Sequence, residues 1–290
     1  MKDRNPTGGN QQTSVPQFKQ LEEAAEAQGR IAEEEFSAPR HATNYQRFFV
    51  PVLAVAWCIF QLSTASWLIL NSTYIRSIHL GFAISLAYFS YPAVRRPLKG
   101  FFSFLSAREH IPFMDILMGT VAAVAALYYL LDYSGLSMRS GAPLQRDIVI
   151  GVILVLLLLE AARRVIGPAL TVIATLFTGY VFFAEHMPED FAFRSTSLGK
   201  YVDKISLSTE GIYGIPLDVS ATVVFLFVLI GAMMERAGGG RFYIELSLSV
   251  LGRFKGGPAK AAIVGSGLTG IVSGSSIANI VTTGTFTIHL

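Results

Sequence analysis

Six stretches of about twenty mainly apolar residues dominate this chain of 290 residues. A helix needs roughly twenty apolar residues to cross a hydrocarbon core of about 30 Å, and inside lipid every backbone polar group needs an internal partner. Charged residues make up only 15% of the chain, whereas soluble domains carry roughly 25%. The pattern predicts an all-α polytopic membrane protein with about six transmembrane helices, at 48–70, 75–94, 112–132, 147–163, 167–185 and 218–237.

Lys and Arg gather in alternate loops. They occur in the tail before the first segment, after the second, after the fourth and after the sixth, while residues 185–217 are rich in Asp and Glu. Cytoplasmic loops of membrane proteins carry an excess of Lys and Arg, so we expect the amino terminus in the cytoplasm. With a net charge of only +3, this distribution indicates contact with membrane lipid and no nucleic acid partner.

A change of composition divides the chain into regions. Residues 1–47 are a polar, cytoplasmic tail, and residues 48–187 contain bulky segments rich in Leu and aromatic residues. Residues 188–217 form a long outer loop, and residues 218–290 are rich in Gly, Ser and Thr. We expect a scaffold before the loop and the working region after it. The single cysteine, Cys58, excludes a disulfide framework within the chain.

Two shorter segments have a helical pattern without the length to cross a membrane. One is Leu198 to Ile205, and the other lies within 238–256, where apolar residues at 242, 246, 250 and 254 share one face. Both patterns favour helices that lie along the membrane surface.

A few ionisable residues interrupt the apolar segments. Glu160 precedes two arginines by three and four residues, which predicts an ion pair with Arg163 or Arg164. Asp115 and Asp218 stand near the starts of predicted helices and are expected to cap them. His79 is a lone histidine, so a packing role is the simplest interpretation and a role as a proton carrier is disfavoured.

The carboxy-terminal stretch Ala261–Leu290 contains no Asp, Glu, Lys or Arg, yet its centre, Gly270–Asn279, is full of glycines and hydroxyls. Such residues weaken a helix, and broken helices survive at membrane depth only inside protein or beside a wet cavity. We therefore expect a re-entrant helical hairpin, with a first arm at 259–272, a tip at 273–276 and a second arm at 277–288. A plain seventh span, whose small residues pack against a neighbour, also explains the glycines.

The tip offers oxygen donors for a cation. Ser273, Ser275, Ser276 and the Asn279 amide, together with free backbone carbonyls near Gly274, form a neutral oxygen cage. Calcium and magnesium usually recruit carboxylates, so a neutral cage suits a monovalent ion, and sodium is the expected metal. An intramembrane serine hydrolase with His289 as base is disfavoured because no Gly-x-Ser-x-Gly elbow is present at these serines. We expect a protein that is not an enzyme.

The segment from Gly265 to Ile288, GSGLTGIVSGSSIANIVTTGTFTI, closely resembles the first hairpin of the large permease in tripartite ATP-independent periplasmic (TRAP) transporters. The preceding residues 219–257 resemble the same region more loosely. The upstream segments are similar in architecture to the small permease plus a linking helix, as in fused permeases served by TAXI-type solute-binding proteins.

This resemblance implies a secondary importer of the bacterial inner membrane. A periplasmic TAXI-type binding protein would deliver an organic acid, a sodium gradient would drive its uptake, and the large permease would move it by an elevator motion. The resemblance places Ser273, Gly274, Ser275, Ser276 and Asn279 in a sodium site and Thr282 and Thr283 near the substrate. His289 stands where the family pattern has Pro, and an inverted second half would be expected beyond Leu290, so the chain resembles the amino-terminal portion of such a permease.

One hypothesis of another class stays open at the level of sequence. A membrane scaffold or assembly subunit that does not transport would use the Gly/Ser/Thr segment only as a helix-packing face.

Overall fold

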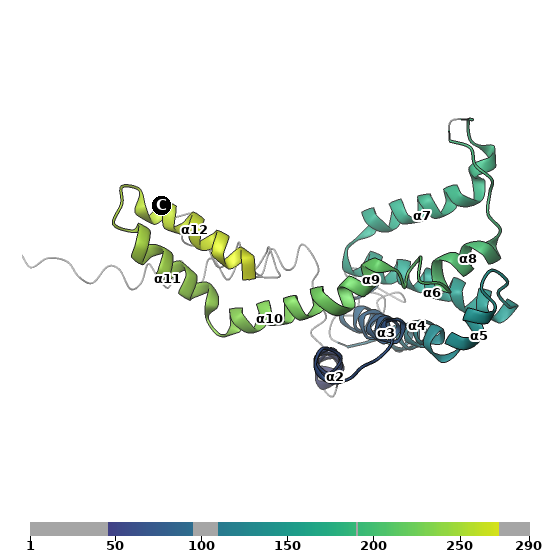
Figure 1. Ribbon diagram of the computed structural model, residues 1–290, viewed down its shortest axis with the longest axis horizontal. Coiled ribbons are helices and arrows are strands. Elements are labelled where there is room, and N and C mark those ends of the chain that lie inside the picture. Colours follow the sequence, from purple (N-terminus) through teal and green to yellow (C-terminus); the bar gives the residue numbers. More distant parts are fainter. Residues whose placement is uncertain (1–45, 95–109, 190, 273–290) are drawn as a thin grey trace, which may run out of the picture. The chain divides into compact units, whose positions relative to one another are not determined.

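The computed structural model describes residues 46–94, 110–189 and 191–272, and these residues form helices and no strand. The all-α fold class is therefore confirmed. Helices occupy all six predicted transmembrane segments (Figure 1): α2 (Gln46–Ser66), α3 (Ser72–Ser90), α4 (Phe113–Leu131), α6 (Gln145–Val165), α7 (Pro168–Phe183) and the continuous run of α9 (Ile215–Val219), the π-helical turn η3 (Ser220–Val224) and α10 (Phe225–Arg236).

Four of these helical stretches are long and apolar enough to cross a membrane: Phe48–Ser66, Phe113–Leu131, Pro168–His186 and Ile215–Arg236. The other two, α3 and α6, are helices of 19 and 21 residues with more polar sequences. Helix α3 contains Arg76 and His79, and α6 begins and ends with charged residues. The count of six spans stays a prediction for these two helices.

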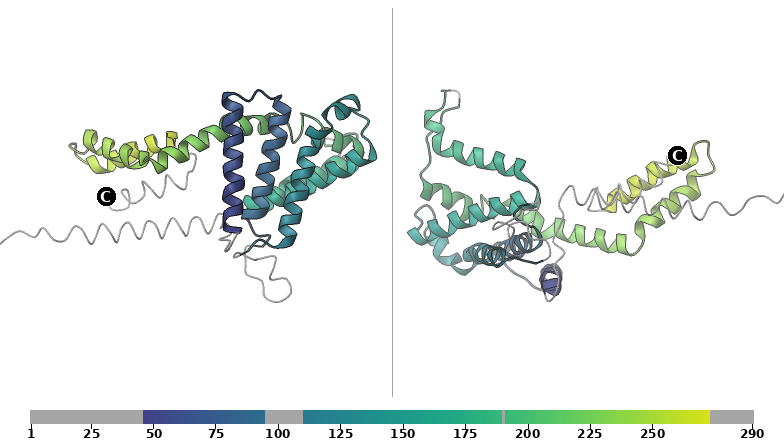
Figure 2. Two further views of the ribbon diagram at one scale, coloured as in Figure 1. Left: turned by 90° about the horizontal axis from the view of Figure 1, so that it is seen from below. Right: turned by 180° about the vertical axis from the view of Figure 1, so that it is seen from behind.

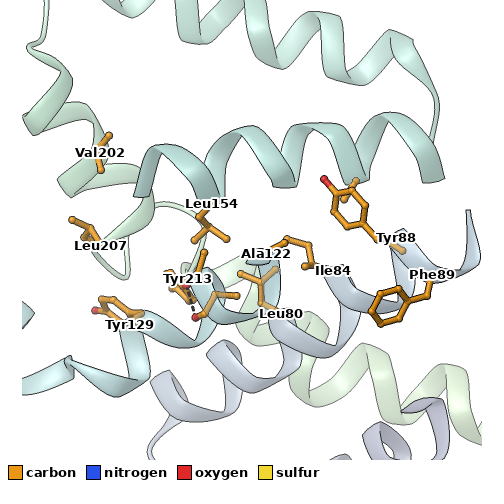
Figure 3. Packing of buried hydrophobic residues seen from close by; sticks show 14 of the residues in the cluster. Leu80, Ile84, Tyr88, Phe89, Ala122, Tyr129, Leu154, Val202, Leu207 and Tyr213 are labelled. Atoms are coloured by element: carbon orange, nitrogen blue, oxygen red, sulfur yellow. Dashed lines mark hydrogen bonds between the residues drawn. The ribbon is translucent and has the colours of Figure 1, made fainter. Parts of the chain in front are cut away.

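The chain divides into two compact units, one of which comprises residues 37–226. Its core lies between α3, α4 and α6, and Figure 3 shows the buried side chains that fill it. Small residues let α3 and α4 approach closely, as Gly119 illustrates: a Cβ atom there would lie 2.8 Å from the Phe89 ring. Helices α2 and α3 stand side by side as an antiparallel pair (Figure 2).

Two tyrosine hydroxyls at this core donate hydrogen bonds to backbone carbonyls of neighbouring helices. Tyr88 donates to Leu157 O at 2.9 Å, and Tyr213 donates to Ala126 O at 2.8 Å. The Tyr213 ring also stacks on Tyr129 with centroids 4.6 Å apart. Burial raises the pKa of Tyr213, because the charged phenolate is disfavoured away from water.

Helices α6 and α7 are joined by a single tight turn. Gly167 has φ 112°, a conformation that side chains rarely adopt, and Pro168 follows as the first residue of α7. No residue of α7 is buried in the structure described, and its Leu170, Ile173 and Phe177 are at least half exposed. A helix with this surface is suited to lipid.

The predicted helix near residue 198 is confirmed as α8 (Leu198–Ser206), which follows η2 (Ala184–His186). It packs on α6, where Gly151 leaves room for the side chains of Val202 and Ser206. A short helix, α5 (Tyr133–Met138), follows α4. These contacts place the outer loop against the helical core of the first unit.

The described residues of the second unit run from 227 to 272 and include α11 (Gly239–Leu251) and α12 (Gly257–Val272). The two helices lie side by side (Figure 1). The helix predicted within 238–256 is confirmed as α11, and its apolar face is exposed: Phe242, Leu246 and Val250 are 42–59% accessible, while Phe254 follows the end of the helix. Its position on a membrane surface stays a prediction.

Candidate functional site

The predicted sodium site at Ser273, Gly274, Ser275, Ser276 and Asn279 lies outside the described residues, as do Thr282 and Thr283. The structure describes the helix that leads to this site. The first arm, predicted at 259–272, is helical as part of α12. The tip, the second arm and the choice between hairpin and plain span stay predictions.

Helix α12 packs against α11 through small residues. Ala261 and Ala262 are buried, and a Cβ atom on Gly265 would lie 3.4 Å from Ile244 Cα and 3.5 Å from Ser247 Oγ. The hydroxyls on this face bond within their own helices: Thr269 Oγ1 donates to Gly265 O at 2.8 Å, and Ser247 Oγ donates to Tyr243 O at 2.7 Å. This half of the Gly/Ser/Thr pattern thus serves helix packing.

A second polar site lies within the first unit, where α2 and α3 meet η3. We define the Gln61 cluster as Trp57, Gln61, His79, Ser220 and Ala221. Gln61 Nε2 donates to Ala221 O and lies 3.0 Å from His79 Nδ1, while His79 Nε2 lies 3.4 Å from Ser220 Oγ. Gln61 and His79 are 1% and 4% exposed. Polar side chains at such depth in a membrane protein are costly, and they mark candidate functional sites.

An ion pair joins α3 to α9, the helix that precedes η3. Arg76 Nε donates to Asp218 Oδ1 at 2.8 Å, and Arg76 Nη1 donates to Tyr213 O at 2.7 Å. The prediction that Asp218 caps a helix is wrong, because α9 begins after Gly214 and has no side-chain capping bond. Asp218 instead ties α9 to α3.

Charged clusters also stand at both ends of α6. At its end, Glu160 accepts from Arg163 Nε at 2.7 Å and from Arg164 Nε at 2.8 Å, which confirms the predicted ion pair. Arg164 Nη1 further donates to Asp115 Oδ1 at 2.9 Å. Asp115 was expected to cap α4, but no side-chain capping bond is made at that helix start.

At its start, α6 places Asp147 within reach of Arg139 Nη2, at 3.2 Å, and of the Tyr128 hydroxyl. Hydrogen bonding to Asp132 raises the pKa of Arg139, so this guanidinium stays charged. These contacts hold α4 and α6 antiparallel, as the alternating basic loops predict. Which end faces the cytoplasm stays a prediction.

Sequence reasoning missed Gln61 and treated His79 as solitary. The available signal was the pair Trp57 and Gln61, four residues apart in an apolar stretch and therefore on one helical face. Among the described residues, no group of three or more His, Cys, Asp or Glu side chains is arranged to hold a metal ion.

Residues 153–290 match the family model described as "Tripartite ATP-independent periplasmic transporter, DctM component". This match confirms the resemblance to TRAP permeases. It begins within α6, upstream of the transport region predicted from residue 218, and that boundary stays a prediction. No curated protein and no solved structure matches the chain.

Proposed function

We propose that this chain, whose residues 153–290 match the DctM family of TRAP transporters, is a permease component of a sodium-coupled secondary importer of organic acids. The family match and the apolar helices support a multi-pass membrane protein of a transporter. Sodium coupling, an organic acid as solute, delivery by a TAXI-type periplasmic binding protein, the bacterial inner membrane and a cytoplasmic amino terminus are parts of the proposal.

The observation that carries the proposal is the extent of the family match. It covers α11 and α12, and it continues through the predicted tip and second arm. Helix α12 carries one charged residue, Lys260, near its start and none beyond it. A helix with this distribution can carry an uncharged tip into hydrocarbon.

The chemistry of the predicted tip supports sodium as the coupling ion. The segment from 273 to 279 supplies three serine hydroxyls, one amide oxygen and no carboxylate. Carbonyls freed at a broken helix would complete an oxygen shell for a monovalent cation, and amides at a helix start suit a carboxylate solute. Thr282 and Thr283 are proposed to lie near that solute.

The packing of α11 on α12 favours the alternative of a scaffold subunit for one part of the Gly/Ser/Thr segment, the part within α12. Gly265 is explained by its close approach to Ile244, without any ligand. That contact does not account for the hydroxyls and amide from Ser273 to Asn279, which follow the described end of α12. The transporter proposal accounts for both.

Sodium binding can be tested without knowing the solute. The protein would be purified, and its thermal unfolding followed while sodium replaces potassium at constant ionic strength. A ligand that binds only the folded state stabilises it by about 2.7 kcal/mol at roughly one hundred times its dissociation constant. We expect sodium to raise the unfolding temperature of the wild type, and Asn279→Ala to remove most of that increase.

Ser249→Ala is the matched control, because Ser249 is exposed on α11 and its hydroxyl donates to Leu246 O of the same helix. This variant should keep the full sodium response. Equal sodium responses in the wild type and in Asn279→Ala would contradict the proposed site. Stabilisation by potassium as strong as by sodium would contradict sodium selectivity.

A further inference from the structure

The hydrogen bonds of the Gln61 cluster determine where its protons are. The carbonyl of Ala221 can only accept a hydrogen bond, so the Gln61 group that faces it is the amide NH2. The same NH2 lies 3.0 Å from His79 Nδ1, which must therefore accept and carry no proton. His79 is thus neutral, with its proton on Nε2, directed at Ser220 Oγ 3.4 Å away.

The π-helical turn explains why the Ala221 carbonyl is available to Gln61. In an α-helix the N–H of residue 225 would bond the carbonyl of residue 221, four positions earlier. Here the Phe225 N–H bonds Ser220 O, five positions earlier. The Gln61 amide occupies the place that the Phe225 N–H would take in an α-helix. Single π-turns inside α-helices are frequent at functional sites.

Two buried polar atoms of the cluster are left without a partner among the described residues: Gln61 Oε1 and Trp57 Nε1. Because Nε2 faces both Ala221 O and His79, Oε1 is the amide atom that makes no hydrogen bond with the described residues. A buried acceptor without a partner is unfavourable. The amide would gain a partner for Oε1 if His79 carried a second proton.

We propose that His79 is an intramembrane proton-binding site whose occupancy selects between the π-helical and α-helical forms of residues 220–225. A proton taken from water binds Nδ1, and the new N–H then opposes the Gln61 NH2. Rotation of the amide by half a turn brings Oε1 to Nδ1–H and withdraws the NH2 from Ala221 O. The Phe225 N–H transfers from Ser220 O to Ala221 O, and no covalent bond other than N–H changes.

The surroundings of His79 are suited to such a change. From α2 it meets Trp57, whose ring lies 4.9 Å away, and from the η3 run it meets Phe225, at 5.8 Å. Two charged residues on the elements around it, Arg76 on α3 and Asp218 on α9, neutralise each other in an ion pair. Helix α4 contributes Tyr129, which stacks on Tyr213 rather than on the imidazole. Protonation of His79 therefore introduces a new charge that the Gln61 oxygen can partner.

Conversion of the π-turn changes the register of the helix that follows. A π-helical turn takes up one residue more than an α-helical turn, so its conversion shifts Phe225 and Leu226 by about one residue, or about 100°, around the helix axis relative to the residues before Ser220. Proton binding at one imidazole would thus be converted into a shift of the side chains that follow η3.

The first measurement reads the protonation of His79 through its aromatic neighbour. The chain has two tryptophans, and Trp67→Phe leaves Trp57 as the single emitter. Charged imidazolium quenches a nearby indole more strongly than neutral imidazole. In this chain of 290 residues in lipid nanodiscs, we expect Trp57 emission to fall as the pH is lowered and the imidazole gains its second proton. His79→Phe should abolish this change, while His186→Asn, on an exposed residue, should leave it intact.

The second measurement reads the helix register. Spin labels on the exposed residues Ile215 and Val224 report the distance along η3 by electron paramagnetic resonance. We expect the wild-type distance to change with the same pH midpoint as Trp57 emission. Gln61→Leu should show the low-pH distance at every pH. His79→Phe should show the high-pH distance at every pH.

Histidine nitrogen NMR of the wild-type protein adds a readout that needs no variant of the cluster. At neutral pH it should show His79 protonated at Nε2 only. A proton on Nδ1 at neutral pH, an emission change that survives His79→Phe, or a distance that responds to pH equally in Gln61→Leu would each overturn the proposal. None of these readouts uses sodium or solute, so their outcome is separate from that of the sodium-binding test.

Discussion

Arg164 is the residue whose removal should cost the first unit most. Its side chain and that of Asp115 are 2% and 4% exposed, and their nitrogen and oxygen lie 2.9 Å apart. The guanidinium also bonds Glu160 at 2.8 Å and lies 4.5 Å from the centre of the Tyr88 ring. One side chain of α6 thus contacts α3 and α4 together.

The loss of unfolding free energy in Arg164→Leu can be compared with the loss in Arg163→Leu, its neighbour in sequence. Removing one partner of a buried ion pair leaves a charge without compensation and costs about 3–5 kcal/mol. Arg163 bonds the same carboxylate, but its side chain is 38% exposed. Exposed ion pairs contribute roughly 0–1 kcal/mol. We therefore expect Arg164→Leu to lower the free energy of unfolding by about 3–5 kcal/mol and Arg163→Leu by about 1 kcal/mol.

Unfolding of the full chain by sodium dodecyl sulfate in mixed micelles, followed by circular dichroism, measures both changes. The double variant Asp115→Leu with Arg164→Leu replaces the pair by apolar side chains and should recover most of the loss. Equal costs for Arg163→Leu and Arg164→Leu would refute the reasoning. So would a double variant whose loss equals the sum of the single losses.

Two further predictions concern packing and burial. Gly265→Leu should force α11 and α12 apart and lower the free energy of unfolding by about 1–3 kcal/mol in the same assay. Gly267→Leu should be tolerated, because no heavy atom of the described residues lies within 4 Å of a Cβ atom at that position. Equal losses in the two variants would refute the proposed contact. Tyr213→Phe should cost about 1 kcal/mol by removing the bond to Ala126 O. The pKa of Tyr213 is raised above its ordinary value of 10.0, so the neutral phenol stabilises the folded wild type less as the pH rises beyond 10.0. In a series of unfolding curves at increasing pH, the free energy of unfolding should therefore fall less in Tyr213→Phe than in the wild type.

The helices could be predicted from the sequence because each depends on a local pattern. Length and hydropathy placed α2, α4 and α7 close to their observed bounds. The spacing of Glu160 and Arg163 lies within one helix, so their ion pair follows from helical geometry alone.

Contacts between distant segments could not be predicted in this way. Asp115 meets Arg164 across 49 positions, and Gln61 meets Ala221 across 160. The π-turn has no sequence signal of its own that we can identify, since Ser220–Val224 is an ordinary apolar and hydroxyl-bearing stretch. The candidate sodium residues beyond Val272 lie outside the described residues and stay a prediction.

The charged clusters at the two ends of α6 have a consequence for the choice of lipid. Asp147 and Glu160 are thirteen positions apart, so the uncharged part of this helix is about 20 Å long. The hydrocarbon layer of a typical bilayer is about 30 Å thick. Where α6 crosses the bilayer as predicted, this hydrophobic mismatch is relieved by local thinning, so α6 should be accommodated best in bilayers of short-chain phospholipids, and acyl-chain length becomes a variable in any reconstitution.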